Sequence, residues 1–505
     1  MTIHPEIDAF ARTHAAGKPQ LVWTRLVSDL ETPVSAFLKL ADGRPNSFLF
    51  ESVEGGAVRG RYSFIGLMPD LIWRCRGEKA EINRRARSSA DAFEPCAGGV
   101  LDSLRALIAE CRVEIPAGIP PMASGLFGYM GYDMVRLMER LPDTTKDVLG
   151  VPDGMFLRPA IVAIFDNIED MVTLVTTAWP QPGESANQAY DRARERLADA
   201  IGHLDRPVPT RHEAPLSGMP APAEPSSNMS RERFHDMVRK GKEYIFAGDI
   251  FQVVLSQRFA VPFTLPPLAL YRALRRVNPS PFLFFLDLGG FAIVGSSPEI
   301  LVRLRDGKVT IRPLAGTRKR GATPAEDKAL EAELRADPKE LAEHLMLLDL
   351  GRNDVGRVAK VGMVKVTEKF EIERYSHVMH IVSNVEGELD PAHDAISALV
   401  GGFPAGTVSG APKIRAMEII DELEEERRGV YAGAVGYFAG NGAMDTCIAL
   451  RTALVKDGVV YVQAGGGVVA DSDPEAEYQE TRNKARALIR AAEEAVRFAQ
   501  RGGKN

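Results

Sequence analysis

The sequence has little cysteine. Its 505 residues include only four, which are Cys75, Cys96, Cys111 and Cys447. No two of them have a CxxC spacing, which argues against a disulfide framework and against a zinc site. Few cysteines also suit a reducing compartment, so we expect a cytoplasmic protein.

An excess of charge of either sign is also missing. The chain has 62 Lys and Arg against 68 Asp and Glu, a formal net charge of −6, which argues against a general binder of nucleic acid or anionic membranes. The uncharged stretch 395–412 is interrupted by Gly and Pro and cannot cross a bilayer as a helix. The N-terminus has no basic stretch followed by an apolar one, so it does not resemble a secretory signal. We therefore expect neither nucleic acid nor a membrane among the partners.

Apolar periodicity is present on both sides of one Pro/Ser-rich stretch. Residues 205–229 have almost no periodic apolar positions, which predicts a linker between an N-terminal region, 1–204, and a C-terminal region, 230–505. The sequence leaves open whether these two regions are independent domains.

Short apolar runs with tight turns between them predict antiparallel hairpins. One pair is 71–76 with 79–82, and another is closed by Asp306-Gly307. Helices are predicted near 231–247, 266–277, 324–351, 392–401, 412–428 and 474–499. Pairs of strands separated by helices indicate an α+β fold of antiparallel sheets with helices on their outer faces, and not a doubly wound parallel sheet.

Two of the predicted helices carry pairs of glutamates. Each begins at an Asp-Pro pair, an N-cap followed by Pro at the first helical position. The pairs are Glu340 with Glu343 and Glu477 with Glu480, three residues apart and so on one face. Spacing alone favours solvated surfaces, and Glu340 also fits a capping box with Asp337. If the two helices converge, their oxygens suit a hard cation such as Mg²⁺ that helps to bind an anionic substrate.

Several glycine-containing segments offer backbone amides to a ligand. They are Gly465-Gly466-Gly467, Gly316-Thr317 and Gly406-Thr407. Three consecutive glycines weaken a strand but let its amides approach a ligand such as a carboxylate, although a flexible loop at the strand end is an equal alternative. The Gly-Thr pairs add hydroxyl groups, and ordinary turns use the same residues.

One histidine and one arginine stand out in apolar segments. His377 and His380 fall on opposite faces of a predicted strand, so one of them points inward. A hydrogen-bonded core histidine is the ordinary explanation, and a general acid or base is the functional one. Arg451 interrupts an apolar run, and a buried guanidinium needs an anionic partner in the protein or in a substrate.

Six segments, in this order, carry a resemblance to a known family. They are KELAEHLMLLDLGRNDVGRV, RYSHVMHIVSNVEGEL, GTVSGAPKIRAMEIIDELE, GAVGYF, DTCIALRTALV and VQAGGGVVADSDPEAEYQETRNKARA. The chain resembles the chorismate-utilising enzymes and, among them, the component I family of anthranilate synthases. The match is dense over 230–490 and looser over 20–180. The resemblance implies a sandwich of large antiparallel β-sheets flanked by helices, consistent with the predicted hairpins.

The resemblance also implies roles for individual residues. Glu343 and Glu480 would ligate Mg²⁺, with Glu340 and Glu477 supporting them through water. Chorismate would be held by Gly316, Thr317, Tyr431, Arg451, Gly465, Gly466 and Gly467. His380 would be the inward histidine and would help the C4 hydroxyl to leave, with Thr407 nearby. The region 230–505 would then be catalytic, and 1–204 would contribute to an inhibitor pocket.

Two further positions bear on which reaction is run. Relatives that use water as nucleophile place a Lys base where this chain has Gln252. Because ammonia needs no such base, Gln252 favours amination. Aminodeoxychorismate synthases commonly have a nucleophilic Lys where this chain has Ala315, which favours direct attack at C2. Because some of them lack that Lys, aminodeoxychorismate synthase component I remains the alternative.

The resemblance extends to a pocket for L-tryptophan as feedback inhibitor. Its expected lining residues are Ser52, Pro281, Phe282 and Leu283, in segments like the family's LLES strand and NPSPY loop. Phe282 replaces the commoner Tyr, which keeps the ring and loses a hydroxyl. A catalytically silent, tryptophan-binding subunit is a further alternative, disfavoured because the residues of the substrate site are all present.

No cysteine lies in the Gly-framed turn that a glutaminase nucleophile needs. A separate glutamine amidotransferase subunit, component II, is therefore expected as the source of ammonia.

Overall fold

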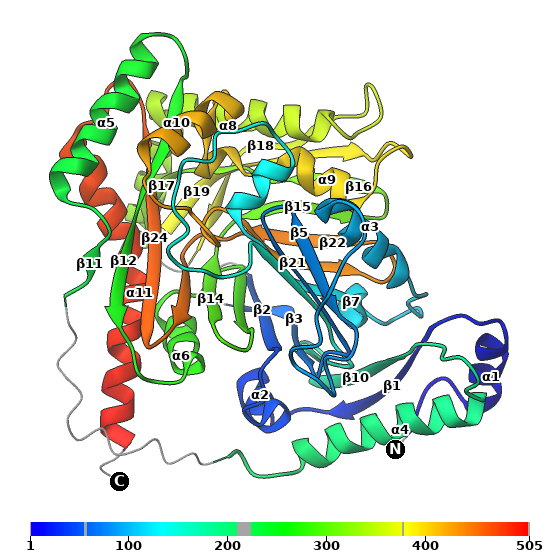
Figure 1. Cartoon of the computed structure of the whole chain (residues 1–505). Coiled ribbons are helices and arrows are strands. Elements are labelled where there is room, and N and C mark those ends of the chain that lie inside the picture. Colours follow the sequence, from blue (N-terminus) through cyan, green and yellow to red (C-terminus); the bar gives the residue numbers. More distant parts are fainter. Residues whose placement is uncertain (1, 55–57, 210–223, 376–377, 503–505) are drawn as a thin grey trace.

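The computed structural model describes residues 2–54, 58–209, 224–375 and 378–502. In this part of the chain the strands form two antiparallel sheets of twelve strands each, with helices around them (Figure 1). The predicted α+β sandwich of large antiparallel sheets is confirmed.

The first sheet has the order β1 (Gln20–Val27), β10 (Met171–Ala178), β9 (Ile161–Asp166), β3 (Val58–Leu67), β2 (Ser47–Glu54), β13 (Phe282–Asp287), β14 (Ala292–Ser297), β23 (Thr452–Lys456), β24 (Val459–Val468), β12 (Gln252–Pro262) and β11 (Ser226–Ser227), with β20 (Gly410–Ala411) also paired to β12. The second has the order β17 (Leu314–Lys319), β19 (Val378–Glu388), β16 (Lys308–Ile311), β15 (Ile300–Arg305), β22 (Met444–Ile448), β21 (Ala434–Ala439), β7 (Gly125–Met130), β8 (Gly154–Arg158), β4 (Leu71–Arg76), β5 (Lys79–Asn83) and β6 (Glu94–Pro95), with β18 (Lys365–Arg374) also paired to β19.

Strand β2 shows how the sequence pattern places the core. Successive residues of a strand point to opposite faces, so Phe48 and Phe50 lie between the two sheets and Leu49 lies under helices. The ring of Phe48 stacks on Phe127 of β7, with the two centroids 4.7 Å apart. Pairs of this kind contribute about 0.5–1.5 kcal/mol beyond their burial. The space between the sheets is thus a largely aromatic layer.

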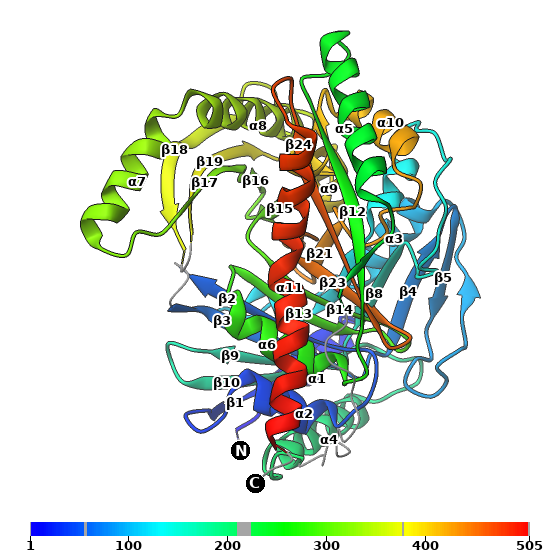
Figure 2. The same ribbon diagram turned by 90° about the vertical axis from the view of Figure 1, so that its left-hand side faces the viewer.

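Helices cover the outer faces of both sheets. The first sheet is covered by α1 (Ile7–Ala15), α2 (Pro33–Ala41), α4 (Ala186–Leu204), α6 (Pro267–Val277) and α11 (Pro474–Gly502). The second is covered by α3 (Val100–Glu110), α8 (Pro338–Gly356) and α9 (Ala395–Gly402), whereas α10 (Lys413–Leu423) packs on β12 and β20 of the first sheet. Figure 2 shows α11 running along the molecule between α6 and α5 (Arg231–Phe246). No described helix combines the length and apolarity needed to cross a bilayer.

The segment 324–351, predicted as helical and with a helix start at Asp337-Pro338, is two helices. The chain turns at Asp337 between α7 (Pro324–Ala336) and α8, because the Asp337 carboxylate accepts the backbone N–H groups of Lys339 (3.0 Å) and Glu340 (3.2 Å). The predicted capping box is wrong in its second half: the Glu340 carboxylate accepts from the Arg318 guanidinium (3.1 Å) instead of the Asp337 N–H. Tertiary contact therefore outcompetes a local bond at this position.

Regions 1–204 and 230–505 contribute strands to both sheets. In the first sheet β2 pairs with β13, and in the second β7 pairs with β21. Most of the predicted linker, 210–223, lies outside the described residues. Its end at Ser226–Ser227 is strand β11, paired with β12, which the apolar pattern does not reveal because backbone hydrogen bonds hold it.

Candidate active site

The two glutamate helices bring their carboxylates together. On α8, burial raises the pKa of Glu343, and the negative charges of Glu340 and Glu480 raise it further. On α11, burial raises the pKa of Glu477, with a further rise from Glu480. Mutual effects of this kind require short separations. The four residues therefore form one acidic cluster between α8 and α11. The solvated-surface alternative is wrong for Glu477, which is buried, and for Glu343, which is partly buried, whereas Glu480 is exposed.

Two cations, one on α11 and one on β17, balance part of this charge. Lys484 Nζ lies 2.7 Å from Glu480 Oε1 and donates to the Gly465 carbonyl oxygen at 2.9 Å. Arg318 neutralises Glu340 on the other helix. In the described ranges, no three His, Cys, Asp or Glu side chains are already arranged as metal ligands.

One oxygen of the acidic cluster is left without a partner. Glu477 accepts from Ser472 Oγ through Oε1 at 2.7 Å, whereas its buried Oε2 makes no hydrogen bond. A buried carboxylate oxygen without a donor is costly. An all-oxygen donor set with one unused buried oxygen fits a hard cation such as Mg²⁺.

The glycine run 465–467 lies within β24 and pairs in regular register with β12, which excludes the flexible-loop alternative. A Cβ added at Gly465, Gly466 or Gly467 would lie 2.7, 2.8 or 2.3 Å from Tyr431 Oη, Glu477 Oε2 or Gln252 Nε2, respectively. Any larger residue would displace these side chains. The glycines therefore leave room for three predicted site residues to lie directly against the backbone of β24.

His380 on β19 is a buried histidine of this site. Its Nδ1 lies 3.1 Å from the Gly316 carbonyl oxygen and 3.0 Å from Thr317 Oγ1. Burial, followed by the charge of Arg451, lowers the pKa of His380 to about 4, so the ring is neutral near pH 7. With Nδ1–H donating to Gly316, the lone pair of Nε2 is free. His377 lies outside the described residues.

Two charged residues lie where the chain crosses from one sheet to the other. Glu299 stands between β14 and β15, and Arg451 stands between β22 and β23. The crossings are tied together, since Ser296 N–H donates to the Arg451 carbonyl and Ile448 N–H to the Glu299 carbonyl, both at 3.1 Å. The expectation that Arg451 interrupts a strand is wrong. It sits at a bend with φ of 48°, a left-handed conformation that costs a non-glycine residue about 1–2 kcal/mol.

Glu299 and Arg451 do not form an ion pair with each other. Burial raises the pKa of Glu299 to about 8, although the positive charge of Arg451 opposes the rise. Burial lowers the pKa of Arg451, and its guanidinium forms no ion pair with any described carboxylate. The buried Thr407 hydroxyl lies beside Glu299. The site thus contains a carboxyl that is protonated at neutral pH and a cation without an internal anion.

A separate cavity of about 300 Å³ holds the four residues predicted for tryptophan, which are Ser52, Pro281, Phe282 and Leu283. Asp445 lies in the same wall. Its Oδ2 accepts from Arg303 (3.1 Å) and Arg305 (2.7 Å), while its buried Oδ1 has no partner. An adjoining cavity of about 440 Å³ shares Ser52, Pro281 and Phe282 and reaches Glu299.

Three residues of these sites were not predicted from the sequence: Glu299, Lys484 and Asp445. Glu299 follows the apolar run AIVGSS and precedes another, and a lone carboxylate between two apolar strands is a usable signal. Lys484 lies four residues after Glu480 and so on the same helix face. Asp445 in β22 gives no local signal, because only the fold brings it to the cavity.

Comparison with known proteins agrees with this arrangement. Residues 68–490 match the family model described as chorismate binding enzyme. Anthranilate synthase component 1 of Cereibacter sphaeroides is 62% identical over 496 residues, which cover 98% of this chain and 99% of that protein.

Two solved structures are similar as well. The crystal structure of anthranilate synthase component I from Streptococcus pneumoniae is 35% identical, with a TM-score of 0.74, over 92% of this chain and 99% of that one. The menaquinone-specific isochorismate synthase of Escherichia coli shares the fold at 20% identity, with a TM-score of 0.69, over 96% and 98% of the two chains.

The two packed antiparallel sheets and the acidic cluster agree with the family match over residues 68–490. The chain belongs to the chorismate binding enzyme family. Within that family, its relatives at 62% and 49% identity are both named anthranilate synthase component 1. The resemblance predicted from the sequence, to anthranilate synthase component I, is thereby confirmed.

Proposed function

We propose that this chain is the large subunit of an anthranilate synthase, which converts chorismate and ammonia to anthranilate and pyruvate as the first step of tryptophan biosynthesis. The observation that carries the proposal is Gln252, which is 4% exposed and faces Glu343 in the acidic cluster. An amide cannot remove a proton from water, whereas ammonia attacks through its own lone pair. The reaction that suits Gln252 is therefore amination.

The substrate contacts follow from the charges of the site. Chorismate has two carboxylates, and the site offers Arg451, which lacks an internal anion, and Lys484, which lies among the glutamates. The remaining contacts are those assigned above to Gly316, Thr317, Tyr431, Gly465, Gly466 and Gly467. Glu343 and Glu480 would hold Mg²⁺, with Glu340 and Glu477 supporting through water, and the bound ion supplies positive charge that neutralises a substrate carboxylate.

Two buried groups divide the proton transfers. Ammonia forms a bond to C2, the two ring double bonds shift, and the C4–O bond breaks. The new ammonium group at C2 releases one proton to water, and the hydroxyl departs as water if it receives a proton. Glu299, whose pKa is raised to about 8, is protonated at neutral pH and can donate it. His380, whose pKa is lowered to about 4, is neutral. Its free Nε2 suits removal of the C2 proton as the C3–O bond breaks, pyruvate leaves and the ring becomes aromatic. This proposal moves His380 from the loss of the C4 hydroxyl, the role predicted from the resemblance, to the second step. Thr407, predicted nearby, lies beside Glu299 and would orient its carboxyl.

In this proposal the ammonia comes from a second protein. Cys75, Cys111 and Cys447 are buried, and burial raises the pKa of the Cys111 thiol to about 11, far from the thiolate that a glutaminase needs. The name component 1, carried by the relatives, supports a component II glutaminase as partner.

The purified chain alone tests this proposal. With chorismate, Mg²⁺ and ammonium at mildly alkaline pH, we expect anthranilate fluorescence to appear, and glutamine in place of ammonium to give none. Chromatography identifies the product. A 4-aminated product would assign the chain to aminodeoxychorismate synthesis, and absence of any product would leave only a silent subunit.

We further propose that the 300 Å³ cavity binds L-tryptophan as feedback inhibitor. The unpartnered Oδ1 of Asp445 supports an amino-acid ligand, because an ammonium group would satisfy it. Ser52→Ala is expected to raise the tryptophan concentration for half-inhibition about three- to tenfold, the effect of one lost hydrogen bond, without changing uninhibited turnover. Inhibition curves with Ser88→Ala, an exposed serine, as control check this; identical curves for all three proteins would remove Ser52 from the inhibitor site.

A further inference from the structure

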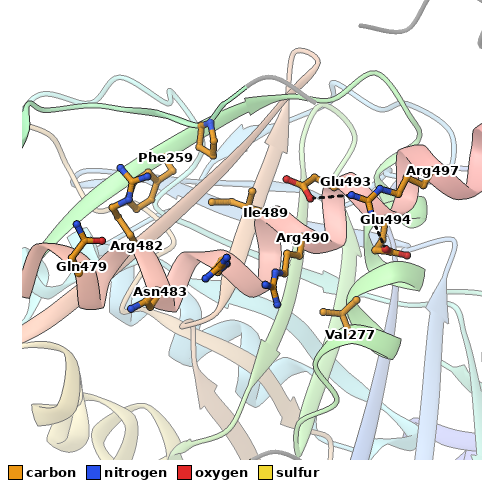
Figure 3. Close-up of a pocket in the computed structure, with 12 residues that line it drawn as sticks. Phe259, Val277, Gln479, Arg482, Asn483, Ile489, Arg490, Glu493, Glu494 and Arg497 are labelled. Atoms are coloured by element: carbon orange, nitrogen blue, oxygen red, sulfur yellow. Dashed lines mark hydrogen bonds and ion pairs between the residues drawn. The ribbon is translucent and has the colours of Figure 1, made fainter. Parts of the chain in front are cut away.

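A groove of about 850 Å³ runs along α11 beyond the acidic cluster (Figure 3). Its walls come from α11, from β12 and from the end of α6. Four arginines of α11 line it, Arg482, Arg486, Arg490 and Arg497. Figure 3 shows Arg482 and Arg490 extending from the helix and Arg497 joined to two glutamates at the far end.

Three of these arginines have no acidic partner. Arg482, Arg486 and Arg490 lie four residues apart, one above the other on one face of α11. Arg482 contacts the Tyr478 hydroxyl at 3.2 Å, and within the described ranges none of the three forms an ion pair. Like charges at this spacing destabilise a helix by about 0.2–0.5 kcal/mol per pair. In a chain of net charge −6, a basic stripe that no described residue compensates favours an anionic partner.

The shape and charge of the groove limit the kind of partner. Val277 and Ile489 give it apolar surface. At its far end Arg497 is already neutralised by Glu494 (3.2 Å) and Glu493 (3.8 Å). A continuous polyanion would run into these carboxylates, whereas a short polypeptide segment with two or three acidic side chains and apolar residues between them matches both features. Guanidinium groups bind carboxylates in a bidentate geometry that favours such a segment.

We propose that the groove binds an acidic segment of the glutaminase subunit. This inference rests on the proposed function, which requires a second protein bound to this chain. The groove begins at Gln479, next to Glu480 on the same helix, so a partner bound along α11 is held by the element that also forms the substrate site.

The test uses the full chain with Arg486→Glu and Arg490→Glu combined. The affinity for the purified glutaminase subunit, measured by titration calorimetry at low and high salt, is expected to fall at least about tenfold, with a weaker salt dependence. Ammonium-dependent turnover of the isolated chain should stay within about twofold. The control combines Arg12→Glu and Arg194→Glu, exposed arginines of α1 and α4 with the same charge change, and should bind the partner normally.

A second variant, Arg486→Gln with Arg490→Gln, removes the charges without reversing them and should show a smaller loss of affinity. Unchanged partner affinity in both groove variants would overturn the inference. A loss of self-association in sedimentation with no loss of partner affinity would also overturn it. That result would assign the groove to a second copy of the chain. Failure of the unmodified chain to aminate chorismate with ammonium would instead remove the proposed function, so the two failures are distinguishable.

Discussion

Glu299→Gln is expected to lower kcat for anthranilate formation by about 10²–10⁴-fold, the usual contribution of a positioned general acid. The Gln side chain keeps the size of the carboxyl but has no acidic proton for the departing C4 hydroxyl. Because Glu299 forms no ion pair with a described residue, the substitution breaks no ion pair, and the fold should persist. Steady-state fluorescence with ammonium as nitrogen source measures the loss, and chorismate affinity by calorimetry should change less than about threefold.

The pH profile gives Glu299 a separate signature. Its pKa is raised to about 8, so the proton is present below that pH, and kcat should fall as the pH rises through about 8. The free ammonia concentration must be held constant across the series, since it also changes with pH. In Glu299→Gln this alkaline fall should disappear. Glu371→Gln, an exposed glutamate on β18, serves as control and should behave like the unmodified chain; an alkaline fall retained in Glu299→Gln would assign it to another group.

His380→Ala is expected to lower anthranilate formation by about 10²–10⁴-fold, since it removes the neutral imidazole placed to accept the C2 proton. That step follows amination, so chorismate should still be consumed and an aminated ring compound that retains the enolpyruvyl group should accumulate. Chromatography with mass detection measures both compounds. His393→Ala, at an exposed histidine, is the matched control.

The outcome also separates two roles of His380. Accumulation of the aminated compound assigns it to pyruvate elimination. Equal loss of chorismate consumption and anthranilate formation would place His380 in the first step, as an aid to hydroxyl departure. Full activity of His380→Ala would remove it from the reaction altogether.

Several features of this protein could be derived from local sequence because local contacts produce them. Asp306-Gly307 forms the predicted tight turn, with φ of 50° and 73°, since Asp and Gly tolerate that conformation. Asp337 caps α8 as its position before Pro338 predicts. The three-residue spacing of the glutamates places each pair on one helix face whatever the rest of the chain does.

Other features were decided by the tertiary structure. The sequence by itself determined the antiparallel α+β class, the two glutamate helices and, through six ordered motifs, the family. It did not determine that strands of 1–204 join strands of 230–505 in both sheets, or that Glu299 and Arg451 meet at the two crossings between the sheets. The tertiary structure also decides the opposite pKa shifts of Glu299 and His380, because burial disfavours the charged form of each residue. Desolvation depends on which distant elements pack around a residue, and no spacing along the chain records it.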